Sequence, residues 1–369
     1  MNAGLKYTLW TLLWCAVVGY VVYAAMLSRS VRQELRVKRV EIDLRDSSAT
    51  GYLLTAERIL RWIDQEQIPT VGEPVDRVPI SRIEERIARD GFAEKVVVYI
   101  DPEGVLHIRV EQRNPVFRLL ADGRDCYVTQ DGYVFDAPRG TSVYVPVVTG
   151  DYRPPFARDF SGRVRSSINQ EQARMTDEIW QLERSKSPRY EGIERFGDSM
   201  RAERRRFIKP RWWMLETDDD PEFLERVHDL RQEKKLNLRR FRYMRDRYRD
   251  TIRQISREQQ SRREGQKKLE KYYEDFINLL TFVGKVEKDA FWRSEVVQIV
   301  AHSTPAGALE VDLVPRSGRF IIRFGQLERI ENKLLKLRRF YHSGLARAGW
   351  DTYRTIDVRY ENQVICNRK

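Results

Sequence analysis

The hydrophobic pattern begins with a membrane-like run near the amino terminus. Residues 7–27 are 21 consecutive residues without a charge. Since about 20 helical residues cross a hydrocarbon core about 30 Å thick, this run predicts an uncleaved transmembrane anchor after a short tail, residues 1–6. A cleaved signal peptide is the alternative. Its apolar region usually spans about 7–15 residues, and Ala24-Ala25 offers a cleavage site.

The next region, residues 36–112, predicts a strand–helix–helix–strand–strand module. Apolar residues alternate in its strands and recur every three or four residues in its helices. Thr55 is expected to cap the first helix, and Ser81 with Glu84 forms a capping-box pattern for the second. A Pro- and Gly-containing turn at residues 101–104 joins the last two strands. One apolar sheet face therefore packs against two helices.

Short strands continue to residue 150 and reappear after residue 270. The second set comprises strand candidates over 296–301, 309–314 and 320–324, followed by a helix that stops at Gly349. Near the carboxyl end, Ile356, Val358 and Tyr360 alternate with polar residues, and Val364 and Cys366 keep the same parity. The pattern leaves open whether residues 355–366 form one strand or two.

A charged helical excursion, residues 155–270, separates the two sets of strands. Residues 201–270 hold 22 basic and 14 acidic residues. Narrow apolar stripes run along this stretch, and such stripes need a partner surface from their own hairpin, from this chain or from another. A solvated helical excursion is the favoured interpretation. A nucleic-acid arm is disfavoured because acidic residues are interspersed throughout.

Composition excludes several kinds of site. The 369 residues are 41% hydrophobic and 33% charged, with a net charge of +12. Only 4 His and 3 Cys are present, at spacings that fit no zinc ribbon or finger. The sequence has no P-loop, dinucleotide, G-x-S-x-G or H-E-x-x-H motif. We therefore predict a chain that is not an enzyme and needs neither a metal nor a cofactor.

Two cysteines lie in predicted strands on opposite sides of the excursion. Cys126 and Cys366 can pair if the distal domain lies in an oxidising compartment. We predict a Cys126–Cys366 disulfide, with two buried free thiols as the alternative.

Several short motifs, in order, resemble the FtsQ/DivIB cell-division family, most closely FtsQ of Bacteroidetes-type bacteria. They are the single anchor, Q-R-N-P at 112–115, Asp131-Gly132, P-x-x-x-G at 146–150, I-D-V-R-Y at 356–360 and the ending N-Q-V-I-C. The resemblance implies an α+β fold: a POTRA domain at 36–114, then a mixed β-sheet domain with helices, formed by 115–154 and 271–369. The charged helical insertion at 155–270 departs from the family pattern.

The resemblance also implies a function and a membrane topology. It predicts a non-enzymatic, single-pass inner-membrane scaffold at the division septum, with a cytoplasmic N-terminus and a periplasmic bulk. Five basic residues between 29 and 39 favour the opposite orientation, but long domains can override that rule. The expected partners are FtsB/FtsL (DivIC-like) and other divisome proteins, with no nucleic acid. They would add a strand at a terminal-strand site that comprises Ile356, Asp357, Val358, Arg359, Tyr360 and Val364.

The alternative hypothesis is that the chain is a POTRA-type chaperone for outer-membrane protein assembly. Strand addition also recognises unfolded barrel strands, so a POTRA module alone fits both functions. This alternative predicts repeated POTRA modules or a C-terminal barrel, and the sequence pattern indicates neither.

Overall fold

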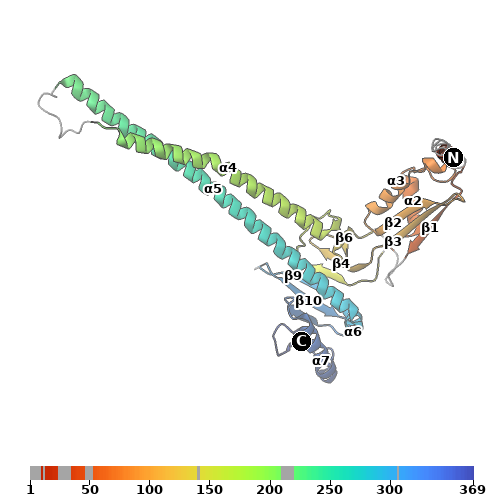
Figure 1. Cartoon of the computed structure of the whole chain (residues 1–369). Coiled ribbons are helices and arrows are strands. Elements are labelled where there is room, and N and C mark those ends of the chain that lie inside the picture. Colours follow the sequence, from red (N-terminus) through yellow and green to blue (C-terminus); the bar gives the residue numbers. More distant parts are fainter. Residues whose placement is uncertain are drawn as a thin grey trace. The chain divides into compact units, whose positions relative to one another are not determined.

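The computed structural model describes residues 10, 13–23, 35–45, 53–138, 142–208, 220–305 and 307–369. The chain forms two compact units. The first comprises Met1–Val164 together with Asp275–Lys369, and the second is Arg165–Glu274. The predicted α+β class is confirmed by a sheet-rich domain and a long helix (Figure 1).

A three-stranded sheet and two helices build the amino-terminal module. Strand β1 lies parallel to β3, and β2 lies antiparallel to β3 on its other side. This is the predicted strand–helix–helix–strand–strand order. The elements are β1 (Arg39–Arg45), α2 (Ala56–Gln65), α3 (Ile80–Arg89), β2 (Ala93–Ile100) and β3 (Val105–Gln112), with a 3-10 turn at Val75–Arg77.

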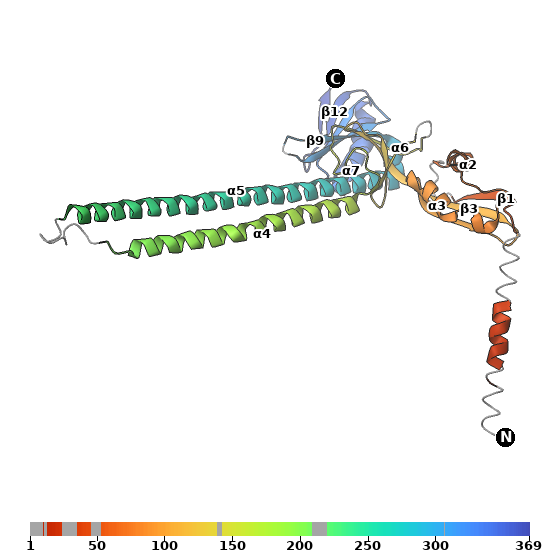
Figure 2. The same cartoon turned by 90° about the horizontal axis from the view of Figure 1, so that it is seen from above.

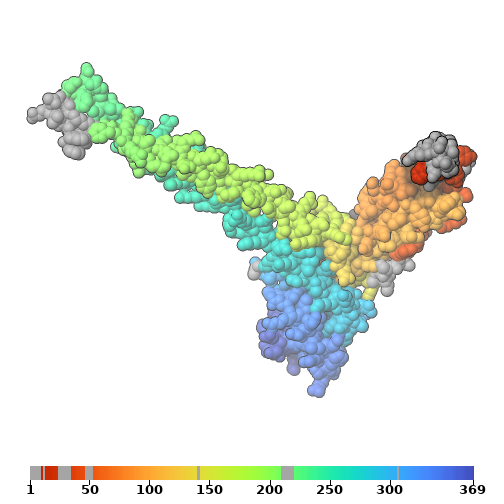
Figure 3. Space-filling view, in the orientation of Figure 1, coloured from red at the N-terminus to blue at the C-terminus, as the bar shows by residue number. Residues whose placement is uncertain are grey.

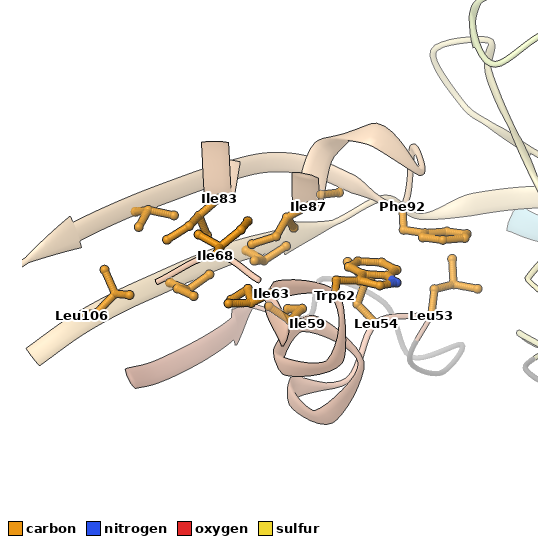
Figure 4. Close-up of a cluster of buried hydrophobic side chains, with 14 of the residues drawn as sticks. Leu53, Leu54, Ile59, Trp62, Ile63, Ile68, Ile83, Ile87, Phe92 and Leu106 are labelled. Carbon is orange, nitrogen blue, oxygen red and sulfur yellow. The ribbon is translucent and has the colours of Figure 1, made fainter. Parts of the chain in front are cut away.

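Apolar side chains from both helices fill the space over this sheet (Figure 4). Ile59 of α2, Ile83 and Ile87 of α3 and Leu106 of β3 are completely buried. Each such side chain contributes roughly 1.5–3 kcal/mol of transfer free energy. The amphipathic periodicity that predicted the two helices is therefore the pattern of this core.

The two predicted helix caps have different outcomes. The Thr55 hydroxyl accepts a hydrogen bond from the Arg58 amide at 3.3 Å, as predicted. The capping box on α3 is wrong, because that helix already begins at Ile80 and Ser81 lies inside its first turn. The Glu84 carboxylate instead accepts a hydrogen bond from the Val98 amide of β2 at 2.9 Å. Glu84 therefore ties the helix to the sheet.

A second sheet of ten strands unites the two halves of the distal domain. Its order is β13-β12-β11-β10-β9-β7-β4-β5-β6-β8. Strands β7 and β9 pair in parallel, so the segments before and after the helical excursion meet in the middle of one sheet. The strands are β4 (Pro115–Ala121), β5 (Cys126–Thr129), β6 (Tyr133–Asp136), β7 (Val147–Gly150), β8 (Gly162–Arg163), β9 (Val296–Ser303), β10 (Leu309–Pro315), β11 (Ile321–Gly325), β12 (Tyr353–Asp357) and β13 (Ile365–Arg368).

Helices accompany this sheet in the same unit. They are α6 (Ala290–Glu295), α7 (Ile330–Phe340), a π turn at Tyr341–Leu345 and α8 (Ala346–Ala348). The Asp289 carboxylate caps α6 and accepts two hydrogen bonds from Arg338 of α7, both 2.5 Å long. Phe282, Trp292 and Phe324 are buried in the core of this domain.

Two long helices, α4 (Val164–Arg205) and α5 (Pro221–Lys288), form an antiparallel hairpin. The second unit takes α4 from Arg165 and α5 up to Glu274, and the last turns of α5 belong to the first unit. The two helices lie side by side in both cartoon views, and their side chains form a continuous surface (Figures 2 and 3). As α4 advances, its contacts move back toward the start of α5, as an antiparallel pair requires. Successive contacts join Gln172 to Glu270, Glu178 to Arg262, Lys186 to Gln259 and Phe196 to Phe241. Part of the apolar stripe on α5 is thus paired within its own hairpin, since Phe196 packs against both Phe241 and Tyr248.

The expected anchor, residues 7–27, is described only at Trp10 and residues 13–23, which are helical. The rest of the run lies outside the described residues, as do the tail at 1–6 and the basic residues Arg29 and Arg32. Among the described residues, no helix combines the length and the apolar character that a membrane crossing requires.

The predicted Cys126–Cys366 disulfide is wrong for this structure. Both thiols are free, and six strands separate β5 from β13 in the sheet. With strands about 4.8 Å apart, the path between them is roughly 34 Å, whereas a disulfide needs Cα atoms about 4.4–6.8 Å apart. Burial raises the pKa of the Cys126 thiol to about 12, so it stays protonated at neutral pH.

Candidate partner-binding site at the C-terminal edge of the sheet

The carboxyl-terminal residues form two strands, and only the second lies at the sheet edge. Strand β12 pairs in parallel with β11 and antiparallel with β13, so both of its edges are occupied. Strand β13 is the end of the strand order within the described residues. It therefore presents one row of backbone groups that a further strand can use.

The structure separates the predicted site residues into buried and exposed ones. Ile356 and Val358 are completely buried, and Asp357 is only 8% exposed. Their side chains cannot touch a partner while the sheet is intact, so these three residues do not contact one directly, contrary to the prediction. Tyr360 is 47% exposed and lies outside the core, although it has the same parity as Ile356 and Val358. Val364 is half-buried just before β13.

An ion pair anchors the segment that links the two strands. The Asp357 carboxylate accepts three hydrogen bonds from the Arg359 side chain, at 2.6–3.1 Å, and one from its backbone amide at 3.0 Å. Burial raises the pKa of Asp357, but hydrogen bonds and positive charge from Arg359 outweigh burial and hold that pKa below its usual 3.8. Arg359 thus keeps a nearly buried carboxylate ionised.

Two lysines of α7 hold the surrounding backbone. The Lys336 ammonium donates to the carbonyl oxygens of Val358 at 2.9 Å and Tyr360. Lys333 donates to the carbonyl oxygens of Phe324 and Gln326, at 3.1 and 2.7 Å. Burial lowers the pKa of both lysines. The sequence pattern alone did not identify these two lysines as part of the site. The available signal was two lysines three residues apart, beside the core positions of a predicted helix.

A groove of about 720 Å³ lies beside this segment. Half-exposed Leu335 and Tyr360 supply apolar surface, and basic residues outnumber acidic ones around them. Its lining is Glu310, Gln326, Glu328, Arg329, Asn332, Lys333, Leu335, Lys336, Arg339, Arg359, Tyr360, Glu361 and Asn362. An amphipathic segment with acidic residues suits a groove of this composition.

Gly325 explains how Arg359 reaches its position. A Cβ atom at residue 325 would lie 2.5 Å from Cγ and 2.7 Å from Cδ of Arg359, and the backbone there has φ +73°. The aliphatic stem of the arginine therefore passes directly over this glycine, which no larger residue can replace without moving it.

We expect Arg359→Ala to destabilise the fold by about 2 kcal/mol at pH 7, because it leaves the nearly buried Asp357 carboxylate without its main partner. The cost should shrink as pH falls below about 4. The low folded-state pKa of Asp357 stabilises the parent above its usual value of 3.8, and that gain is lost on acidification. In the variant, burial instead raises the pKa of this carboxyl, so protonation relieves it.

Urea unfolding of the full chain at pH 7 and pH 3 measures both effects. Arg359→Lys is the matched control, since it keeps the charge but loses the forked hydrogen bonds, and it should fall between the other two proteins. An equal destabilisation at both pH values would contradict the role of the ion pair.

Two family models match this chain. Residues 36–111, which contain the three-stranded module, match the POTRA-like domain. Residues 248–367, which contain strands β9 to β12, α7 and most of β13, match the model described as FtsQ/DivIB, C-terminal related. No curated protein shows a significant match. Domains of these two families are generally scaffolds rather than enzymes, and FtsQ/DivIB proteins take part in cell division. The chain is an FtsQ/DivIB family protein with a POTRA domain.

Proposed function

We propose that this chain is a non-enzymatic scaffold of the bacterial division complex that binds an FtsB/FtsL-like (DivIC-like) partner by strand addition. The partner segment adds to the outer edge of β13, and its flanking residues lie in the groove beside α7. The edge of β13 is the observation that carries this proposal. It belongs to the matched FtsQ/DivIB domain and has no neighbouring strand within the described residues.

Strand addition supplies affinity and specificity from different groups. Main-chain hydrogen bonds to β13 give affinity that depends little on partner sequence. The ring of Tyr360 offers an amphipathic anchor of the kind enriched at interface hot spots. Arg359 lines the same groove and can meet an acidic partner side chain, while Asp357 fixes its direction. Ile356 and Val358 act indirectly, by packing β12 into the core.

The proposed site also involves the residues around the exposed edge. Val364 precedes β13, and Ile365, its first residue, is partly exposed. An apolar partner residue that packs beside them would cover this surface. Lys336 positions the segment through its hydrogen bonds to the carbonyl groups of Val358 and Tyr360, although it need not touch the partner.

We further propose that residues 7–27 anchor the chain in the inner membrane, with the N-terminus in the cytoplasm and the bulk in the periplasm at the septum. The uncharged length of this run supports the proposal. The large downstream domain allows translocation despite the basic residues that follow the run.

Affinity purification from the membranes of its own cells tests the function. We expect division proteins to accompany the full chain and to be lost from a chain that ends at Val364, which lacks β13. This truncation leaves β12 in place. Recovery of division proteins with both chains would move the interface away from β13. Recovery of outer-membrane assembly factors instead would contradict the division role and favour the chaperone function.

A further inference from the structure

The helical hairpin carries an exposed strip of residues that its own helix pairing does not use. The strip, defined as Leu236, Arg239, Arg240, Tyr243 and Arg247, lies on one face of α5, with spacings of three or four residues between successive turns. Leu236 and Tyr243 are 61% and 65% exposed. The hairpin instead buries other positions of α5, including Val227, Ile255 and Gln259.

The three arginines of this strip have no carboxylate partner in the described residues, whereas several neighbouring arginines do. Arg206 pairs with Glu233, and Arg253 pairs with Asp250. Within the described residues, the structure gives Arg239, Arg240 and Arg247 no ion pair. The surrounding stretch 239–263 holds ten arginines, three acidic residues and no lysine. Three exposed guanidinium groups therefore remain available for carboxylates from outside the chain.

We propose that this strip docks an acidic amphipathic helix of a partner protein. Leu236 and Tyr243 are seven residues apart, which is two helical turns and the repeat with which one helix packs against another. Arg240 and Arg247 each follow an apolar residue by four positions, so each places a guanidinium fork beside an apolar contact. Arginine and tyrosine are the residues most enriched at binding hot spots. Forked arginines also pair with carboxylates in a bidentate way.

The charge and the apolar content of the strip disfavour three other kinds of binding partner. A second copy of this strip would bring arginines against arginines, so self-association through it is disfavoured. A membrane surface needs a continuous apolar face, and two isolated residues do not supply one. A nucleic acid would meet Asp246 and Asp250 close to the strip, and Leu236 offers no ring for base stacking. An acidic helix with apolar residues at two-turn spacing fits all five residues.

Photo-crosslinking in the organism's own cells tests the docking helix. Tyr243 of the full chain is replaced by p-benzoylphenylalanine, and the crosslinked peptide is sequenced. We expect an adduct on a segment with acidic residues three or four positions apart, at a yield well above that obtained with the same probe at the exposed position Gln260. Adducts on lipid, nucleic acid or a second copy of this chain would overturn the proposal, as would a yield no greater than at Gln260.

Charge reversal separates a specific strip from general attraction to a basic protein. Arg239→Glu, Arg240→Glu and Arg247→Glu together should reduce the Tyr243 adduct by roughly tenfold or more. The matched control reverses three other exposed basic residues of α5, Arg257, Lys267 and Lys271, and should leave the adduct nearly unchanged. Glutamate and arginine have similar helix propensities, and circular dichroism confirms that the hairpin persists. Equal losses in both triple variants would overturn the proposal.

The outcome is independent of the partner that binds at β13. The truncation after Val364 leaves the hairpin intact, so crosslinking at Tyr243 can persist when the terminal-strand partner is lost. Loss of the Tyr243 adduct in the strip variant should in turn leave co-purification through β13 unchanged.

Discussion

Proline at one of two adjacent positions of β13 is expected to weaken partner binding by about 100-fold without lowering thermal stability. Backbone amides alternate in direction along a strand, so of Ile365 and Cys366 one donates toward β12 and the other toward the open edge. Ile365 and Cys366 pair with Asp357 and Ile356 of β12, in a part of the β12–β13 ladder that has no register shift. Proline removes the amide hydrogen and adds a ring that blocks a neighbouring strand.

The two variants are matched controls for each other. Ile365→Pro and Cys366→Pro should divide into one that lowers the melting temperature and one that leaves it almost unchanged but no longer binds the FtsB/FtsL-like partner. Calorimetric titration and thermal unfolding of the full chain measure both properties. Strand addition at this edge would be excluded if the thermally unaffected variant bound its partner as tightly as the parent does.

Gly150→Ala is expected to destabilise the first unit by about 3 kcal/mol or more, because the new methyl group collides with a backbone. An added Cβ would lie 2.2 Å from the carbonyl oxygen of Ala301, and the residue has φ +114°. Gly150 and Ala301 are opposite each other in the parallel β7–β9 pair that joins the two halves of the sheet. Neither strand can shift without disturbing its other neighbour.

Gly307→Ala provides the control, because Gly307 also has a positive φ, of +71°, but no atom lies within 4 Å of the added Cβ. This variant should lose only about 1 kcal/mol, the cost of the backbone conformation. Urea unfolding, together with hydrogen exchange of β9, compares the two proteins. Similar losses for both would mean that close approach at Gly150 is unimportant.

Local sequence patterns predicted most of the helices and strands, because each helix or strand depends mainly on residues close to one another in the sequence. The alternation around residues 96–110 and the apolar spacing in the two module helices reflect burial on one face, which the sequence records directly. The Ser81–Glu84 pattern failed because Glu84 bonds Val98, a residue on another element. A capping motif competes with tertiary partners that sequence spacing does not reveal.

The candidate site was predicted only in part, for a related reason. Parity placed Tyr360 with Ile356 and Val358, but the chain leaves β12 at Asp357, and the parity rule ends with the strand. Lys336 gives no signal in isolation because its role depends on carbonyl groups 22 and 24 residues away. The disulfide prediction likewise required the strand order, which depends on pairing between distant segments.

The helical hairpin has a consequence for how the sheet can assemble. Strands β7 and β9 are separated by about 145 residues, and closing an unstructured loop of that length costs about 4 kcal/mol of chain entropy. Helices form quickly and pair with their sequence neighbours, and this pairing brings Arg165 within 3.2 Å of Glu270. Once the hairpin has folded, only short segments at its base still need to be ordered. A long insertion between two halves of one sheet then behaves kinetically as a short connection, whatever the length of its helices.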